Sequence, residues 1–355
     1  MTSQTQTQTS SVTAPPPPLP TTTTTTTQAI SIESVQTTMN FYLDPSQGGH
    51  DTFYPGTAAY YRRKFDEQPV TVYNVRGRMS DFSLDIHGFQ YLTHKTAVTN
   101  LENESITTVM YDEVADILKK ATGATKVHTF SHLNRRDSRD AAERKVSTDP
   151  LLESDTSAID LLTPARFVHI DQSRAGAVEV LRDEGSGGPL DADLVRDCMS
   201  GRTRWAIINV WRPLDRPSVT KDPLAVCDSR TVEDSDLVTV RATTPRRPET
   251  QYSDVTKGDG FDVLYMRHKS PQHQHHHHRQ QQQQQWYYLD AQSPDEVLLI
   301  KCFDSQPQSR HGGRSSSVRT PHTAFVDPRY SGSPEWDEKV RNSIEIRSLV
   351  FWENN

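Results

Sequence analysis

Eight short runs of apolar and β-branched residues in the second half of the chain constrain its fold most strongly. Pro, Gly and Asp residues separate each run from the next. The runs are Trp205–Trp211, Leu224–Cys227, Leu237–Val240, Phe261–Met266, Trp286–Leu289, Val297–Phe303, Thr320–Val326 and Ile344–Trp352. Short strands at such spacing are typical of an antiparallel sandwich or jelly roll. We therefore predict a mainly β domain with flanking helices.

The first half of the chain mixes both kinds of element. Three segments alternate apolar and polar residues and predict strands: Val70–Val75, Phe82–Phe89 and Lys126–Ser131. Three segments carry apolar residues at helical spacing and predict helices: Tyr111–Ala121, Ser173–Asp183 and Asp191–Met199. Gly123 follows the first of these helices where a C-cap belongs. The polar run Asn134–Asp149 predicts a surface loop.

The start of the sequence differs sharply in composition from the rest. Residues 1–36 are mostly Thr, Gln, Ser and Pro, including Pro15–Pro18 and Thr21–Thr27. Such a segment buries too little apolar surface to offset its ordering entropy, so we predict a disordered tail. It has no apolar core, and the first Lys or Arg is Arg62, which argues against a secretory signal or a mitochondrial presequence. Residues 37–355 are then expected to form a single catalytic domain.

A low-complexity segment interrupts this domain at residues 268–285. It contains His275–His278 and Gln280–Gln285 between two strand-like runs. Clustered histidines can bind metal, but a run that continues into polyglutamine is more simply explained as an expansion in a hairpin loop. We therefore interpret it as an insertion without a role in the site.

Charge, hydropathy and cysteine content argue against several classes of protein. The formal net charge of −7 and the lack of a basic stripe argue against nucleic-acid binding. No stretch approaches the ~18 apolar residues of a membrane span. Cys198, Cys227 and Cys302 are far apart and form no CxxC pair, so we expect buried, reduced thiols in a cytoplasmic protein. Nothing in the pattern specifies an oligomeric state.

The most informative short motif is the triplet His169-Ile170-Asp171. A histidine and an aspartate two residues apart on extended backbone point their side chains to the same side. Such pairs are common by chance, so this one gains meaning only if a third ligand occurs elsewhere in the chain. His322 lies in the later strand-like run Thr320–Val326. It would complete a set of two histidines and one carboxylate, the ligands of non-haem Fe(II) oxygenases.

Two arginines lie beyond the second histidine. Arg341 and Arg347 are six residues apart, with Ser343 and Glu345 between them, and an even spacing puts all four side chains on one face of a strand. Two cations inside a β-core are costly unless anions meet them. The distal carboxylate of 2-oxoglutarate would supply such an anion to either arginine. Alternatively, Arg347 pairs only with Glu345 or Asp327 as a structural ion pair.

Five longer segments resemble a known family, the fungal hydroxylase/desaturases. The segments are Asn209–Pro213, Pro223–Asp228, Asp295–Ser305, Pro321–Phe325 and Arg341–Arg347. That family includes the gibberellin desaturase and enzymes of the aspergillic acid and cercosporin pathways, and it is related to the cephamycin methoxylation proteins. The resemblance runs from about Met39 to the C-terminus and is broken by the His/Gln segment.

The resemblance implies a double-stranded β-helix (jelly roll) and an oxygenase that uses Fe(II), 2-oxoglutarate and O₂. The expected reaction is hydroxylation or desaturation of a small secondary metabolite. His169, Asp171 and His322 are then implied to hold the iron as the catalytic set. Arg341, in an Arg-x-Ser pattern, is implied to bind the distal carboxylate of 2-oxoglutarate, with Arg347 as the other candidate. Asn209 is a plausible hydrogen-bond donor to the same cosubstrate.

Two other classes of protein stay open at this point. A non-catalytic small-molecule-binding or accessory protein could keep the same β-core, but the complete set of three ligands disfavours it. A cupin-like dioxygenase would need no 2-oxoglutarate, and the presence of Arg341 disfavours that alternative.

Overall fold

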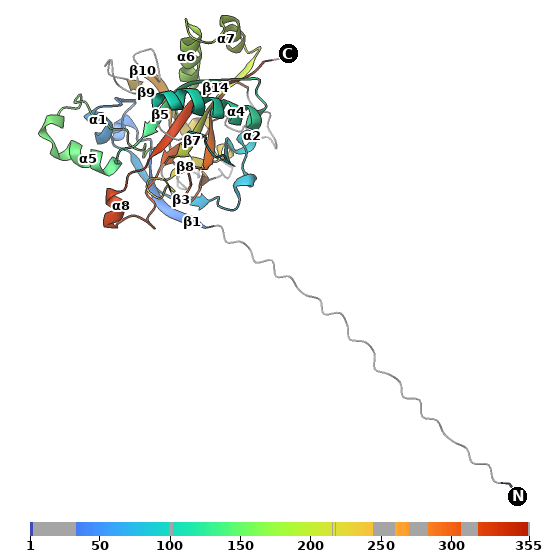
Figure 1. Cartoon of the computed structure of the whole chain (residues 1–355). Helices are drawn as coiled ribbons and strands as arrows, with labels where there is room; N and C mark the ends of the chain where they lie inside the picture. The colour runs from blue at the N-terminus through green and yellow to red at the C-terminus, as the bar shows by residue number, and fades with distance from the viewer. Residues whose placement is uncertain are drawn as a thin grey trace. The chain divides into compact units, whose positions relative to one another are not determined.

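The computed structural model describes residues 1–2, 33–98, 102–214, 216, 218–243, 260–269, 283–306 and 319–353. Residues 33–355 group into one compact unit built around two β-sheets (Figure 1). Most of the predicted tail and of the His/Gln segment lies outside the described residues, so both predictions stay untested. Strand β1 (Ser34–Phe41) begins inside the range predicted for the tail.

The larger sheet has nine strands, and it carries the residues of the predicted metal set. Its strand order is β1, β3 (Asp66–Asn74), β11 (Trp286–Tyr288), β8 (Leu224–Cys227), β13 (His322–Ala324), β6 (His169–Ile170), β10 (Gly260–Met266), β9 (Leu237–Thr243) and β2 (Thr52–Phe53). All neighbours are antiparallel except the pairs β11–β3 and β2–β9. The short strands β6 and β13 lie next to each other near the middle of this sheet.

The smaller sheet has five long strands and provides the opposite wall of the core. Its order is β4 (Phe89–Thr93), β12 (Glu296–Asp304), β7 (Arg204–Pro213), β14 (Ser343–Trp352) and β5 (Lys126–Arg135). Buried residues of both sheets pack in one cluster, including Ile170 and Val226 from the larger sheet and Ile300 and Leu349 from the smaller. The interior between two facing, mainly antiparallel sheets is the jelly-roll arrangement that the eight runs predict.

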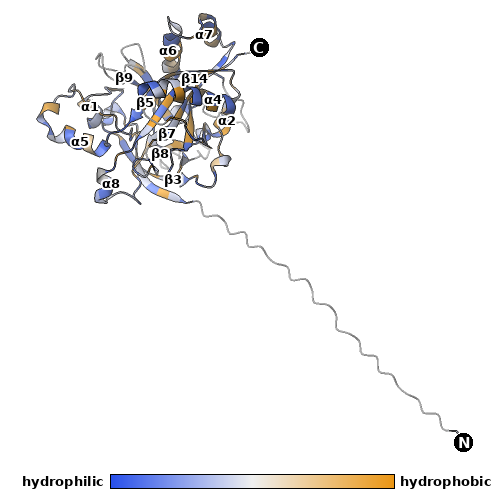
Figure 2. Cartoon of the chain, in the orientation of Figure 1, coloured by the Kyte–Doolittle hydropathy of each residue, from blue (hydrophilic) through white to orange (hydrophobic). Residues whose placement is uncertain are grey.

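Alternation along β14 decides which side chains enter this interior. Ile344 and Ile346 pack in a second cluster with the apolar face of α4 (Tyr111–Thr122), on the outer side of the sheet. Because successive side chains of a strand point to opposite faces, Ser343, Glu345 and Arg347 face inward. In Figure 2 the hydrophobic colour follows β7 and β14, whereas α5 (Arg139–Thr148) is mostly hydrophilic.

The remaining helices flank the two sheets. α6 (Arg174–Gly185) contacts α7 (Ala192–Met199), and α1 (Ala58–Arg62) contacts α5 (Figure 1). The other α-helices are α2 (Leu84–His87), α3 (Asn103–Ser105) and α8 (Pro334–Glu338). Short 3₁₀ or π turns are η1 (Pro45–Gln47), η2 (Met79–Asp81), η3 (Ile106–Met110), η4 (Pro150–Leu152), η5 (Ser229–Thr231) and η6 (Asp234–Asp236).

The predicted strand Phe82–Phe89 is wrong. Residues 84–87 form α2, and the strand begins only at Phe89. Ile86, which the alternation would bury, is 53% exposed. Gly88 ends the helix with φ of +82°, and a Cβ there would lie 2.2 Å from Oγ1 of Thr320. Only glycine fits both the left-handed backbone and this close approach.

The predicted loop Asn134–Asp149 is also wrong, because it contains α5. The Ser138 side chain accepts a hydrogen bond from the Ala141 amide and caps this helix. Only Ala142 and Val146, four residues apart, bury apolar side chains. Two buried apolar residues in ten give too weak a periodicity to recognise in sequence.

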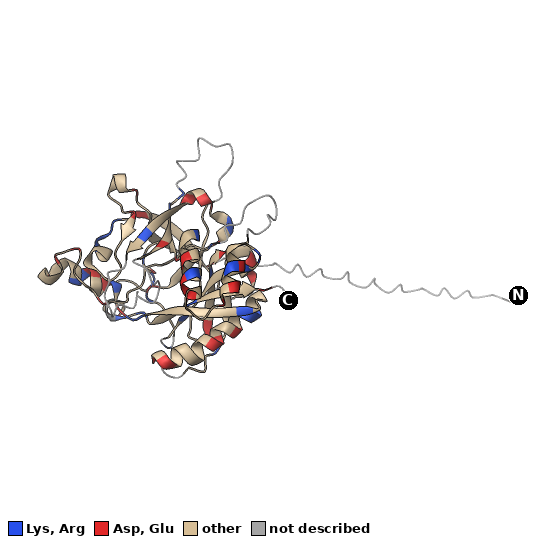
Figure 3. Ribbon diagram, turned by 90° about the horizontal axis from the view of Figure 1, so that it is seen from above, with Lys and Arg blue, Asp and Glu red and all other residues tan. Residues whose placement is uncertain are grey.

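Other features agree with the sequence-based expectations. The helices predicted at Tyr111–Ala121, Ser173–Asp183 and Asp191–Met199 correspond to α4, α6 and α7. All three cysteines are buried and unpaired. No helix in the described part of the chain is long and apolar enough to cross a membrane. Figure 3 shows Lys and Arg interspersed with Asp and Glu along the described helices and strands.

Candidate metal centre

Strand register brings the two histidines together. His322 of β13 lies directly opposite His169 of β6 in an antiparallel pair. Residues opposite each other in such a pair point their side chains to the same face, about 5 Å apart. Their ring centroids are 4.5 Å apart. The pairing of β6 with β13 thus brings together two histidines that are more than 150 residues apart in sequence.

Asp171 joins the two histidines from the bend after β6. The Ser173 amide donates to the carbonyl of Asp262 at 2.8 Å, and the Ser173 side chain caps α6. These contacts hold the chain directly after Asp171. Oδ1 of Asp171 lies 3.3 Å from Nε2 of His169 and 3.7 Å from Nε2 of His322. The three ligand atoms lie within 4.8 Å of one another, and all three residues are buried.

Backbone carbonyls orient both imidazole rings. Nδ1 of His169 lies 2.9 Å from the carbonyl of Phe167, and Nδ1 of His322 lies 3.1 Å from that of Thr320. A carbonyl only accepts, so each Nδ1 is the donor and carries the proton. The lone pair of each ring is therefore on Nε2, which faces Asp171. Such a contact commonly fixes the tautomer of a metal-binding histidine.

The second carboxylate oxygen of Asp171 is held by the opposite sheet. Asn209 Nδ2 donates to Oδ2 at 2.8 Å, and Arg347 Nε donates to the same oxygen at 3.1 Å. Asn209 and Arg347 are partners in the β7–β14 pairing, so the two donors arrive side by side. Arg347 also lies 2.6 Å from Glu345, which is the ion pair considered in the sequence. Oδ1 is then the only carboxylate oxygen of Asp171 that faces the histidines.

Burial and charge set the protonation states at this centre. Burial alone would raise the pKa of Asp171, but Arg347 and the two histidines outweigh it and hold that pKa well below its usual value. Burial lowers the pKa of His169, and the neighbouring His322 lowers it further, whereas Asp171 and Glu345 raise the pKa of His322 against the opposing effect of burial. An ionised carboxylate beside a neutral imidazole is the state that a cation requires.

We predict that Asn209→Ala weakens Fe(II) binding about tenfold to a hundredfold, the usual effect of losing an outer contact to a metal ligand. Its amide fixes Oδ2 and thereby the direction of Oδ1. Anaerobic Fe(II) titration followed by calorimetry measures the change. Ser348→Ala is a matched control, because Ser348 is buried on the same strand pair but bonds to Thr129. Equal iron affinities for the Asn209 variant and the parent would contradict the assignment.

Several buried polar atoms around the three ligands have no hydrogen-bond partner among the described residues. They are Nε2 of His322, Oδ1 of Asn209, Nη1 of Arg347 and Oε1 of Gln172. Buried polar atoms are almost always satisfied, so a group of them around one point indicates a polar occupant. An unpartnered Nε2 suits a metal ligand. The residues present therefore fit Fe(II) at this position.

Arg341 lies in the same interior but does not contact Asp171. Its Nη1 donates to the carbonyl of Asp222 at 2.7 Å, and its guanidinium lies 5.5 Å from the Trp211 ring centroid. Burial lowers the pKa of Arg341 to about 9, so it still carries its charge at neutral pH. Its Nε and the hydroxyl of Ser343 are buried without a partner in the described part of the chain.

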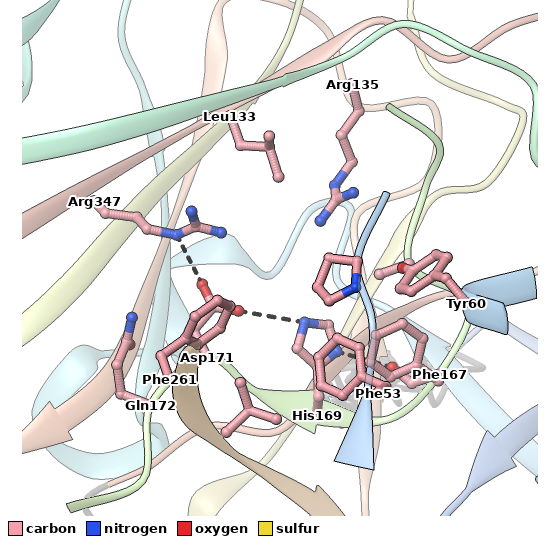
Figure 4. Close-up of a pocket in the computed structure, with 13 residues that line it drawn as sticks. Phe53, Tyr60, Leu133, Arg135, Phe167, His169, Asp171, Gln172, Phe261 and Arg347 are labelled. Carbon is pink, nitrogen blue, oxygen red and sulfur yellow. Dashed lines mark hydrogen bonds and ion pairs between the residues drawn. The ribbon is translucent and has the colours of Figure 1, made fainter. Parts of the chain in front are cut away.

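A pocket opens beside the metal centre, and one of its lining residues escaped the sequence analysis. Arg135, the last residue of β5, lines it together with His169, Asp171, Gln172 and Arg347 (Figure 4). The predicted strand stopped at Ser131. Continuing its alternation by four residues would have put Arg135 on the face of Ser131.

Of the predicted residues, the structure brings four into contact with Asp171: His169, His322, Asn209 and Arg347. Arg341 is in the same core but is not among the pocket-lining residues. The predicted donation of Asn209 to a cosubstrate stays a prediction, since its amide nitrogen here donates to Asp171.

Comparison with known proteins agrees with this geometry. A family described as "Oxidoreductase/YMDC permease-like domain" matches residues 39–351. The hydroxylase/desaturase CTB9 of Cercospora beticola is 35% identical over 323 residues, which are 89% of this chain and 86% of that protein. The hydroxylase/desaturase efuI of Hormonema carpetanum is 35% identical over 92% of this chain and 98% of its own length. The hydroxylase/desaturase asaB of Aspergillus flavus is 32% identical over 91% of this chain and 96% of its own length.

A solved structure supports the fold. The iron and alpha-ketoglutarate-dependent endoperoxidase NvfI superposes with a TM-score of 0.62 at 24% identity, covering 90% of this chain and 98% of that one. The jelly-roll prediction is confirmed. The matched family, the extent of the relatives and the resemblance seen in the motifs agree. The chain belongs to the fungal hydroxylase/desaturase family of Fe(II)/2-oxoglutarate oxygenases.

Proposed function

We propose that this protein is an Fe(II)/2-oxoglutarate-dependent hydroxylase or desaturase that acts on a small secondary metabolite. One observation carries the proposal: two histidine Nε2 atoms and Oδ1 of Asp171 converge within 4.8 Å in a buried site. Two histidines and one carboxylate leave open positions on Fe(II) for a cosubstrate and O₂. The unpaired thiols favour a cytoplasmic location.

Each residue of the centre has a distinct task in this proposal. His169, Asp171 and His322 hold the metal. Bound Fe(II) supplies, with 2-oxoglutarate and O₂, the oxidising power to remove hydrogen from a substrate C–H bond. Asn209 and Arg347 position Asp171 by holding Oδ2, so that the carboxylate presents one oxygen to the metal. Gln172, whose Oε1 has no partner in the described part, faces the same pocket and can accept from a substrate.

Arg341 is the residue we assign to the distal carboxylate of 2-oxoglutarate. It is buried, and no carboxylate lies within ion-pair distance of it among the described residues. A buried cation is costly unless an anion meets it. Ser343, two residues along the chain, offers a buried hydroxyl without a partner. A guanidinium and a hydroxyl together can donate to both oxygens of one carboxylate.

An anaerobic titration with Fe(II) and 2-oxoglutarate tests the function directly. Chelation of the keto acid should produce the metal-to-ligand charge-transfer band in the visible range, and succinate, which lacks the keto group, should not. Iron binding without the band would favour an oxygenase that needs no 2-oxoglutarate. Failure to bind iron would favour a non-catalytic or accessory protein on the same fold.

A further inference from the structure

The pocket beside the metal centre has two chemically different sides. Its lining has a polar part, His169, Asp171 and Arg347, and an aromatic wall of Phe53, Tyr60 and Phe167, whose rings contact one another. The Phe167 ring centroid lies 4.7 Å from that of His169, so the wall reaches the metal ligands. A ring-containing carbon skeleton resting on this wall would therefore lie next to the metal.

Of the two guanidinium groups that line the pocket, Arg135 is the one that forms no ion pair among the described residues. Its Nη1 donates to the carbonyl of Thr163 at 2.6 Å, and its guanidinium is directed into the pocket (Figure 4). No carboxylate lies within 4 Å of it among the described residues. The other lining guanidinium, Arg347, is bound to Asp171 and Glu345. Arg135 is also only partly buried, so it lies where an incoming molecule can reach it.

The charges around the metal centre leave a positive surplus, apart from Arg63, whose guanidinium packs against the rings of Tyr60 and Phe167. Three guanidinium groups, Arg135, Arg341 and Arg347, stand against two carboxylates, Asp171 and Glu345. Fe(II) and the 2-oxoglutarate dianion cancel each other, so one positive charge remains. The network beneath Arg341 does not alter this balance. There two cations, Arg166 and Lys221, meet two carboxylates, Asp140 and Asp222.

We propose that the substrate carries a carboxylate, which Arg135 binds, and a ring-containing apolar skeleton, which lies on the aromatic wall. The proposal rests on the proposed function for the identity of the reacting centre. A planar guanidinium matches a carboxylate through two parallel hydrogen bonds. Aromatic side chains supply large apolar contact without a demand for one particular skeleton. Arg135 is thus a specificity-determining residue, separate from the arginine that holds the cosubstrate.

Two probes with the same rings and different charge test this assignment. 1-Naphthoate and neutral 1-naphthalenemethanol are titrated anaerobically into the full chain, with and without Fe(II) and saturating 2-oxoglutarate. The cosubstrate fills its own carboxylate site, so a preference for naphthoate in its presence reports a second anion site. We expect naphthoate to bind at least about tenfold more tightly, since a hydrogen bond to a charged group has that strength.

Three variants complete the experiment. Arg135→Gln should abolish the preference for naphthoate, and Arg135→Lys should restore part of it. Arg136→Gln, which removes the neighbouring exposed charge, should leave the preference unchanged. Equal binding of the two probes to the parent, no binding of naphthoate at millimolar concentration, or an unchanged preference in Arg135→Gln would overturn the proposal.

The charge-transfer band separates this proposal from the proposed function. If the parent protein forms the band but shows no Arg135-dependent preference for naphthoate, the proposed function stands and the substrate assignment is wrong. Loss of the band in Arg135→Gln would show that Arg135 holds 2-oxoglutarate, which also overturns the assignment. If the parent protein never forms the band, the proposed function is wrong. The comparison of the two probes without iron then still decides whether Arg135 binds a carboxylate.

Discussion

Asp171→Ala should abolish Fe(II) binding and reduce turnover to background, and it should also destabilise the iron-free protein. Oδ1 faces both histidines, so its loss leaves only two metal ligands. Oδ2 accepts from Asn209 and Arg347, and the alanine variant leaves both donors without their acceptor. Breaking a buried ion pair typically costs about 3–5 kcal/mol. Because Glu345 still pairs with Arg347, we expect a value near the lower end.

Asp171→Asn separates the two effects. The side-chain carbonyl oxygen of the asparagine can still accept hydrogen bonds from Asn209 and Arg347. In that orientation the amide nitrogen of the asparagine faces the histidines. A protonated amide nitrogen is no metal ligand, so iron binding should be lost as in the alanine variant. The loss of stability should be smaller, because both hydrogen bonds to Oδ2 are kept. Urea unfolding of the iron-free proteins measures stability, and anaerobic calorimetry measures iron binding. Retained iron binding in both variants would exclude Asp171 as a ligand.

The parts of the site that could be predicted from sequence are those governed by strand periodicity. An even spacing put Ser343, Glu345 and Arg347 on one face of β14, and the packing of Ile344 and Ile346 in the opposite cluster confirms this alternation. Arg341 was predicted on the same strand, but it lies two residues before β14 begins. His322 falls within a strand-like run, so its return to the sheet was expected. The pairing of His322 with His169 also depends on which strands are neighbours, and periodicity contains no information about neighbours.

The parts that escaped prediction depend on contacts between distant segments. Asn209 and Arg347 meet at Asp171 only because β7 and β14 pair in one register. The helix α5 could not be recognised in the sequence because most of its side chains are polar and face solvent. Arg135 was placed in a loop because the strand Lys126–Arg135 continues into polar residues. Its alternation is visible in sequence, but its role depends on the pocket that it enters.

The second large effect concerns the cosubstrate. Arg341→Ala should raise the KM for 2-oxoglutarate about tenfold to a hundredfold, because a hydrogen bond to a charged group contributes about 1.5–3 kcal/mol. Arg341→Lys should recover little, since an ammonium group cannot reproduce the two parallel hydrogen bonds of a guanidinium. Ser343→Ala should have a smaller effect of the same kind. Fe(II) affinity should not change in any of the three, because none of these residues contacts Asp171 or the histidines.

Arg347 is the internal comparison for this prediction, since it is buried in the same interior but lies within β14, whereas Arg341 precedes that strand. Its Nε holds Oδ2 of Asp171, so Arg347→Ala should weaken iron binding first. Initial rates of succinate formation at varied 2-oxoglutarate, with iron saturating, distinguish the two variants. If the KM for 2-oxoglutarate is raised in Arg347→Ala and unchanged in Arg341→Ala, Arg347 is the residue that binds the distal carboxylate. The burial of Arg341 without a carboxylate argues for the first outcome, because that charge needs an anion that the described residues do not supply.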